Sequence, residues 1–243
     1  MKIETAIATD PGRQRLRNED RVCSHRLLAP QLWLVAVADG MGGHEGGDVA
    51  STVAIETVES RAGELDAPPP DPLEFLESTV QEANRNVYGV GRETGADMGT
   101  TLTIALVAEP LLFIAHVGDS RAYCATKRRM DQLTEDHSWE AEQRRARDEG
   151  EASDFPEGAY AGLITRYVGV ASSPKVALYK RALVRDATYV FCTDGLYSCV
   201  ADATIHRQAR RSGDLDRACR QLIQLANRSG GHDNISVGLL RVS

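Results

Sequence analysis

The chain has 243 residues, 42% of them hydrophobic and 26% charged, so it can bury one large core. Its formal net charge of −7 argues against broad nucleic-acid binding, because the phosphate backbone requires a basic face. No apolar run reaches the ~18 residues that a membrane span needs, and Met1–Ala6 lacks a secretion signal, so we expect a cytoplasmic protein.

Strands and helices alternate in the first part of the chain. Residues 3–9 and the continuous apolar run 32–38 predict strands, the second buried on both faces. Apolar residues at helical spacing predict a helix after residue 47. Asp71 followed by Pro72 predicts the start of a second helix. One face of that helix carries Leu76, Val80, Ala83 and Val87.

Short strands dominate from residue 100 onward. We expect an antiparallel meander formed by residues 100–107, 111–117, 121–125 and 130–133. The mainly polar stretch 137–161 predicts a helix start and a mobile loop. Further strands are expected at 175–183, 186–192 and 235–242, and helices at 202–211 and 215–227. This mixture predicts an α+β fold in which two sheets pack together under helices.

Three fragments centred on Asp stand at the ends of strand-like runs. They are Asp39-Gly40-Met41-Gly42-Gly43-His44, Asp194-Gly195 and Gly231-His232-Asp233-Asn234. A carboxylate beside glycine at the end of a buried strand suits a hard cation, because Mg²⁺ and Mn²⁺ prefer oxygen ligands. Each fragment alone is more often a turn, but their joint occurrence favours a site for two divalent cations.

The chain resembles the metal-dependent Ser/Thr protein phosphatases (the PPM or type 2C family) in their compact bacterial form. Eight segments carry the resemblance, in the family's order: Arg15-Leu16-Arg17-Asn18-Glu19-Asp20, Asp39 to His44, Gly99-Thr100-Thr101, Val117 to Tyr123, Leu133 to Ser138, Leu163-Ile164-Thr165-Arg166, Cys192 to Leu196 and Gly231 to Ser236. The resemblance implies a central antiparallel β-sandwich flanked by helical pairs. It also implies a single domain over residues 1–243, with a variable flap at about 138–162 that influences substrate choice.

The resemblance assigns metal ligands. Asp39 would bridge two cations, Mn²⁺ or Mg²⁺, and the Gly40 carbonyl would ligate one of them. Asp194 and Asp233 would complete the carboxylates of the first metal. Asp119 is a candidate for a third, weaker cation, and a turn aspartate that bonds its neighbours is an equal alternative at this position.

Other polar residues receive roles around the metals. Glu19 and Asp20 match the acidic pair that holds metal-bound waters. Arg15 occupies the position of the phosphate-binding arginine, whose guanidinium fork suits two phosphate oxygens, and Arg13 or Arg17 takes that role if the alignment is shifted. His44 is a candidate proton donor to the leaving oxygen, or a residue that only bridges its loop.

These roles predict a protein phosphatase that hydrolyses phospho-Ser and phospho-Thr in one in-line step, by attack of a metal-activated hydroxide. Its expected partners are phosphorylated proteins and a cognate bacterial Ser/Thr kinase, and we expect a monomer. Two alternatives stay open. One is a catalytically silent regulator that binds phosphoproteins, which would lack metal carboxylates. The other is a metallohydrolase acting on small phosphate esters.

Overall fold

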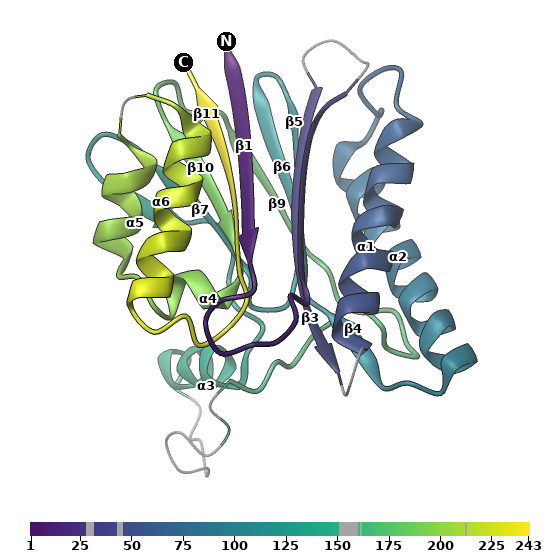
Figure 1. The fold of residues 1–243 in the computed structure, drawn as a ribbon. Coiled ribbons are helices and arrows are strands. Elements are labelled where there is room, and N and C mark those ends of the chain that lie inside the picture. The colour runs from purple at the N-terminus through teal and green to yellow at the C-terminus, as the bar shows by residue number, and fades with distance from the viewer. Residues whose placement is uncertain (28–31, 43–45, 151–159, 161, 212) are drawn as a thin grey trace.

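The computed structural model describes residues 1–27, 32–42, 46–150, 160, 162–211 and 213–243. Two antiparallel β-sheets pack face to face, and a pair of helices covers the outer face of each sheet (Figure 1). The expected α+β sandwich is therefore confirmed. No helix among these residues is long and apolar enough to cross a membrane.

The two sheets have different strand orders. Sheet A contains, from edge to edge, β1 (Ile3–Asp10), β11 (Ile235–Val242), β10 (Thr188–Cys192), β7 (Arg121–Ala125) and β8 (Met130–Gln132). Sheet B contains β2 (Asp20–Arg26), β3 (Leu32–Gly42), β5 (Leu102–Ala108), β6 (Leu111–Val117) and β9 (Ala177–Ala182). The short strand β4 (Met98–Thr100) pairs with the end of β3.

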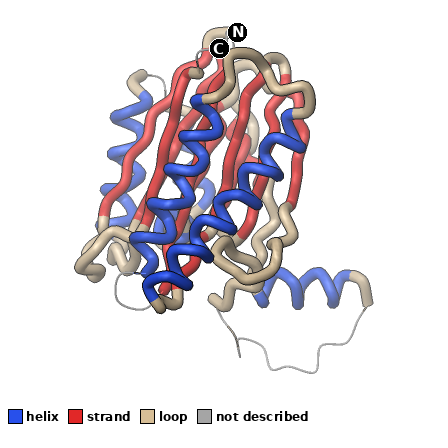
Figure 2. Tube along the Cα trace, turned by 90° about the vertical axis from the view of Figure 1, so that its right-hand side faces the viewer, coloured by secondary structure: helices blue, strands red, loops and turns tan. Residues whose placement is uncertain are grey.

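Six helices surround the sheets in the described part of the chain. Sheet B is covered by α1 (Gly46–Gly63) and α2 (Pro72–Thr94), and sheet A by α5 (Asp202–Ala209) and α6 (Leu215–Arg228). The one-turn helix α4 (Asp194–Tyr197) follows β10 directly. Helix α3 (Trp139–Asp148) lies beyond one end of the sandwich, as both ribbon views show (Figures 1 and 2).

Strand β3 shows why the core has three layers. Leu34 and Ala36 face the helix pair of sheet B, whereas Val35 and Val37 pack between the two sheets. Both faces of the strand are thus buried, because side chains alternate along an extended chain. This explains the unbroken apolar run in the sequence.

The predicted start of α2 is confirmed. The carboxylate of Asp71 accepts hydrogen bonds from the backbone N–H groups of Leu73, at 3.0 Å, and Glu74, at 3.1 Å. These are two of the N–H groups that a helix cannot satisfy internally, so Asp71 stabilises this end of the helix. The four apolar residues predicted to face the core are fully buried.

The expected meander is confirmed in its two hairpins, β5–β6 and β7–β8, and is wrong at the connection between them. Strand β6 pairs with β5 and β9 in sheet B, but the next strand, β7, pairs with β8 and β10 in sheet A. The chain crosses between sheets at Gly118, whose φ is +111°. A Cβ at this position would lie 2.5 Å from the Cβ of Thr101, so only glycine allows the crossing. Strands β2 and β4 and helix α4 were not predicted.

Candidate active site

The predicted aspartates lie at one end of the sandwich, where several strands begin or end. Asp39 lies near the end of β3 and pairs in register with Asp20 at the start of β2. Asp194 follows β10, and Asp233 precedes β11, which runs antiparallel to β10. Asp119 lies in the crossing between β6 and β7. Because neighbouring strands run in opposite directions, residues distant in the sequence meet at this end.

The ionisation of Asp39 shows how close the carboxylates are. Burial raises the pKa of Asp39 well above its ordinary value, and the charges of four other aspartates raise it further. These four are Asp20, Asp194, Asp119 and Asp233. The structure therefore brings together all five aspartates that the sequence singled out. They include Asp20, expected to hold metal-bound water, and Asp119, expected at a third cation.

Two of these carboxylates are incompletely satisfied. Burial raises the pKa of Asp20 to about 7, opposed by a hydrogen bond that Thr193 Oγ1 donates to Asp20 Oδ2 at 2.7 Å. Burial, followed by the charge of Asp194, also raises the pKa of Asp119 to about 7. The Oδ1 atoms of both residues are buried and have no hydrogen-bond partner within the described part of the chain. Buried carboxylate oxygens without partners fit the ligand preference of a hard cation.

The aspartate oxygens are spread more widely than the ligands of a single ion. Among the described residues, the one set of three ligand atoms within 4.8 Å of one another belongs to Cys23, His25 and Glu59, on β2 and α1. Burial raises the pKa of the Cys23 thiol to about 12, so this cysteine is a packed side chain. The wider aspartate cluster fits a pair of cations, which lie about 3.5–4 Å apart in two-metal sites.

Arg15 lies at the aspartate cluster. Its Nη2 donates a hydrogen bond to Asp233 Oδ2 at 2.8 Å, and 54% of its side chain is exposed. The guanidinium thus lies next to a predicted metal ligand while remaining open to solvent. His44 lies outside the described residues.

Glu19 joins the cluster through electrostatics. Burial raises the pKa of Glu19, opposed by the charge of Arg15 and reinforced by Asp48 and Asp233. Its backbone N–H donates to Asn234 Oδ1 at 2.8 Å. The side chain of Asn234 also donates to the carbonyls of Pro11, at 2.9 Å, and Arg17, at 2.7 Å. Asn234, whose role the sequence did not reveal, therefore ties the segment carrying Arg15 and Glu19 to the start of β11.

Gly40 is required by packing. A Cβ at this position would lie 2.0 Å from the carbonyl oxygen of Gly47 and 2.6 Å from that of Glu19. The start of α1 and the segment before β2 therefore approach the backbone of β3 directly. Glycine at this position is therefore required by packing as well as by the expected access of its carbonyl to a cation.

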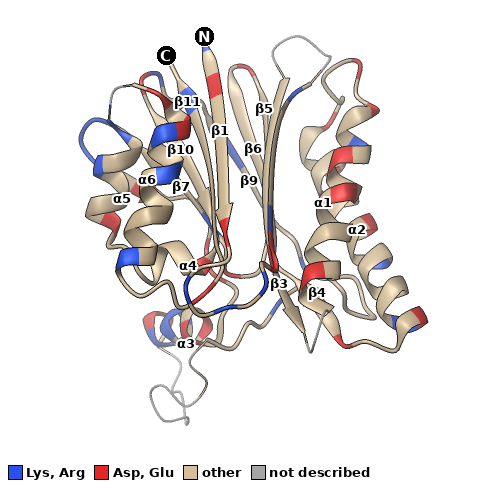
Figure 3. Ribbon diagram, viewed as in Figure 1, with Lys and Arg blue, Asp and Glu red and all other residues tan. Residues whose placement is uncertain are grey.

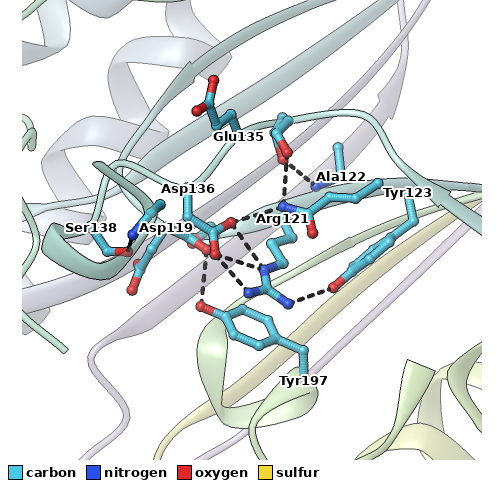
Figure 4. A network of polar contacts seen from close by, with 12 residues as sticks. Asp119, Arg121, Ala122, Tyr123, Glu135, Asp136, Ser138 and Tyr197 are labelled. Carbon is cyan, nitrogen blue, oxygen red and sulfur yellow. Dashed lines mark hydrogen bonds and ion pairs between the residues drawn. The ribbon is translucent and has the colours of Figure 1, made fainter. Parts of the chain in front are cut away.

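A polar network holds the Asp119 segment in place (Figure 4). Arg121 donates to both carboxylate oxygens of Asp136, at 2.6–3.1 Å. The guanidinium carbon of Arg121 lies 3.7 Å from the ring centroid of Tyr197. The Tyr197 hydroxyl donates to the backbone carbonyl of Asp119 at 3.1 Å. Burial raises the pKa of this hydroxyl, so it remains a neutral donor.

Two buried histidines form hydrogen bonds near the segment that carries Asp119. His137 Nδ1 accepts a hydrogen bond from the backbone N–H of Gly118 at 3.1 Å, and His116 bonds Thr103 Oγ1 at 2.8 Å. Burial lowers the pKa of His116 to about 4 and that of His137 to about 3. Both rings are therefore neutral near pH 7, as structural hydrogen-bonding partners require.

The chain is similar in sequence to known proteins. The chain matches the family described as protein phosphatase 2C over residues 19–235. It is 35% identical to the serine/threonine phosphatase stp of Listeria innocua, over 98% of this chain and 95% of that one. It is 34% identical to the serine/threonine protein phosphatase PstP of Mycobacterium tuberculosis, over 97% of this chain and 44% of PstP.

Solved structures agree with the sequence relatives. The serine/threonine phosphatase of S. agalactiae superposes with a TM-score of 0.89 at 30% identity, over 100% of both chains. The catalytic domain of PstP in complex with two manganese ions superposes with a TM-score of 0.84 at 32% identity, over 99% of both chains.

The raised pKa values predict how the metal-free protein responds to pH. Between the ordinary aspartate pKa of 3.8 and about 7, Asp20 and Asp119 ionise in the unfolded chain before they ionise in the folded one. The free energy of unfolding should therefore fall as pH rises through this window. His116 and His137 oppose this trend below pH 6.5, because burial keeps them neutral in the folded chain while they protonate in the unfolded one. The net melting temperature in chelator should therefore fall by only a few degrees from pH 5 to pH 8, since 1 kcal/mol corresponds to about 2–4 °C for a chain of this size. A melting temperature that rises over this interval would contradict the interpretation.

The network in Figure 4 predicts an unequal cost for two Arg-to-Lys changes. Arg121→Lys keeps the charge but loses the paired hydrogen bonds to Asp136 and the stacking on Tyr197, so it should cost about 1–3 kcal/mol of stability. Arg129→Lys, in the exposed pair with Asp131, should cost less than about 0.5 kcal/mol. Urea unfolding of both variants measures the difference, and equal costs would refute the structural role of the network.

Proposed function

The chain belongs to the protein phosphatase 2C family and is a protein serine/threonine phosphatase, and we propose that its aspartate cluster holds two divalent cations for that reaction. The observation that carries this proposal is the convergence of five carboxylates that raise one another's cost of ionisation. Two divalent cations would remove this repulsion and supply partners for the unsatisfied oxygens of Asp20 and Asp119.

The ligand assignment is the one that the family resemblance implies. We propose that Asp39 would hold both cations, that the Gly40 carbonyl would ligate one of them, and that Asp194 and Asp233 would complete the carboxylates of the first metal. Asp119, whose backbone Tyr197 holds, would provide a third, weaker position. Asp20 and Glu19 would orient water around the cations. Manganese is the proposed metal, supported by the two manganese ions of the PstP structure.

The cations would acidify a bound water for attack on phosphorus and neutralise charge on the phosphate oxygens. Arg15 would bind the phosphate of the substrate. Its guanidinium already lies 2.8 Å from Asp233 and is half-exposed, so a phosphate dianion arriving from solvent can replace the carboxylate as its partner. Because charge grows on the phosphate oxygens during in-line displacement, this contact strengthens toward the transition state. His44 is proposed as the proton donor to the leaving oxygen.

The bacterial relatives also support a proposal for the location and partners of this chain. The curated relatives come from bacteria, and phosphorylated proteins are the substrates of this enzyme class. We propose that the chain acts in the cytoplasm as a monomer and opposes a bacterial Ser/Thr kinase.

Asp39→Asn tests the metal assignment. Asparagine is nearly isosteric but carries no charge, so it cannot bridge two cations. We expect kcat on a phosphothreonine peptide to fall by at least ~100-fold, because even residues that only support metal ligands contribute about 10–100-fold. The metal concentration needed for half-maximal activity should rise. Since the change removes a repelling charge, the metal-free variant should melt at a higher temperature than the wild type. Full activity in this variant would end the assignment.

Met41→Ala is the matched control, because Met41 lies two positions beyond Asp39 on the same strand and provides no hard ligand. Its activity should fall by less than about tenfold. A loss as large as that of Asp39→Asn would mean that the wrong residues of β3 have been assigned to the phosphate site.

Substrate class is tested by direct comparison. At matched metal concentration, we expect kcat/KM for a phosphothreonine peptide to exceed that for sugar and nucleotide phosphates by at least about tenfold, a difference worth about 1.4 kcal/mol. Rapid cleavage of the small esters with an inert peptide would instead favour a small-molecule phosphatase, and failure to cleave any phosphate ester would favour a silent binding protein.

A further inference from the structure

A second charged site lies at the opposite end of sheet A. Strand β10 runs from Thr188 to Cys192, next to Asp194, and β11 runs from Ile235, next to Asp233, to Val242. At the ends of these strands far from the aspartates there is a cavity of about 800 Å³, which we call the distal basic pocket. Its cationic side chains are Lys127, Arg128, Arg185, Arg210, Arg211 and Arg241.

The charge of the distal basic pocket is unusual for this protein. Six cationic side chains line it and Asp186 is the one acidic side chain among its described lining residues, whereas the whole chain has a net charge of −7. Figure 3 shows Lys and Arg gathered at the upper left, around the top of α5, and acidic residues at the lower end of β3. The pocket is therefore a local reversal of the overall charge.

The cations of the pocket are not neutralised within the described structure. None of the six lies within 4.0 Å of a carboxylate among the ion pairs of the described residues. Arg241 donates to the backbone carbonyls of Gly213, at 2.7 Å, and Arg211, at 3.0 Å. Arg210 donates to the carbonyl of Asp186. These acceptors fix two guanidinium groups in place without cancelling their charge.

Glu4 is an acid outside the pocket lining that interacts with one of the pocket's cations. It lies opposite Arg241 in the register of β1 and β11, and the charge of Arg241 lowers its pKa less than Lys2 does. Its carboxylate accepts a hydrogen bond from Lys2 Nζ at 2.6 Å. The guanidinium groups of the pocket therefore remain available to an anion from outside.

The lining indicates the chemistry of that anion. Guanidinium groups present planar forks that match phosphate and carboxylate oxygens. The described lining has no aromatic side chain and one aliphatic side chain, Val242, so it offers no aromatic ring for a nucleobase and little apolar surface for a lipid chain. The volume is within the range of ligand pockets, and several phosphate groups would fit in it.

The position of the pocket relates it to the substrate. The eight residues of β11 place the pocket roughly 26 Å from the aspartate cluster, at about 3.3 Å per residue. An extended peptide covers this distance with about eight residues and needs a few more to follow the surface. A phosphoprotein segment held at both ends gains affinity because the second contact is intramolecular.

We propose that the distal basic pocket docks a second phosphorylated part of the protein substrate, about 10–12 residues from the phosphoresidue that is hydrolysed. This inference rests on the proposed function, because it requires a phosphoprotein substrate. The pocket supplies local attraction for a phosphate-rich segment that the net negative charge of the protein would otherwise repel.

The test compares two peptides that share one phosphothreonine. In the first, two phosphonate analogues of phosphoserine, which the enzyme cannot hydrolyse, lie twelve residues away, and in the second these positions are serine. We expect the KM of the wild type to be roughly tenfold lower for the first peptide, at equal kcat. The charge-reversal variant Arg128→Glu/Arg185→Glu should lose this difference. Both residues are exposed and lie in turns, and no side-chain hydrogen bond or ion pair is described for either.

The matched control is Arg92→Glu/Arg217→Glu, which makes the same change in net charge on α2 and α6, outside the pocket. It should keep the KM difference, and all proteins should hydrolyse a small aryl phosphate at the same rate. Equal KM values for the two peptides in the wild type, or a difference that survives in Arg128→Glu/Arg185→Glu, would overturn the docking role.

Two further outcomes distinguish a failure of the docking proposal from a failure of the proposed protein substrate. If tripolyphosphate raises the melting temperature of the wild type but not of Arg128→Glu/Arg185→Glu, while the peptides have equal KM values, the pocket serves free anions and the docking proposal is wrong. If the wild type hydrolyses the aryl phosphate and neither peptide, the proposed protein substrate fails together with the docking site.

Discussion

Five carboxylates meet at one end of the sandwich, and their mutual repulsion opposes the fold that brings them together. Burial and neighbouring charges raise the pKa of Asp20 and Asp119 to about 7, so ionising either group near neutral pH costs free energy of folding. The protein compensates this cost elsewhere. Three apolar layers, formed between the sheets and under each helix pair, hold the strands whose ends carry the charges. The electrostatic repulsion between the carboxylates is thus confined to one end of the sandwich, where bound cations can neutralise it.

Rigid supports keep the aspartates in this arrangement. Asn234 joins the N-terminal segment to β11, and Thr193 bonds both Asp20 and the backbone of Ser236. Tyr197, itself stacked on Arg121, holds the backbone of Asp119. Each support uses a backbone group of a segment distant in sequence, so the site depends on the packing of the two sheets against each other. Positioning by buried hydrogen bonds limits how far the repelling carboxylates can separate.

The sequence predicted the strands that are buried on both faces, because such strands need uninterrupted apolar runs. The bounds of β6, β7 and β11 agree with their predictions to the residue. Strand β2 was missed because it lies at a sheet edge and its sequence is mostly polar. The meander was wrong because hairpin signals are local, whereas the change of sheet depends on Gly118. In the site, Asp39, Asp119, Asp194 and Asp233 could be found from sequence, because each lies within two residues of a glycine. Asn234 and Tyr197 could not, because their partners are backbone carbonyls that only the folded chain brings near.

Acidic and basic side chains lie at opposite ends of β10 and β11 in sheet A. The aspartate cluster attracts cations at one end of sheet A, and the cations of the distal basic pocket attract anions at the other, roughly 26 Å away by the length of β11. Charges at that separation are largely screened from each other in solvent, because the Debye length is about 8 Å at physiological ionic strength. An anion in the pocket therefore changes the electrostatics of the aspartates little. The pocket can influence catalysis only through a molecule long enough to reach both ends, and a flexible phosphoprotein segment has that property.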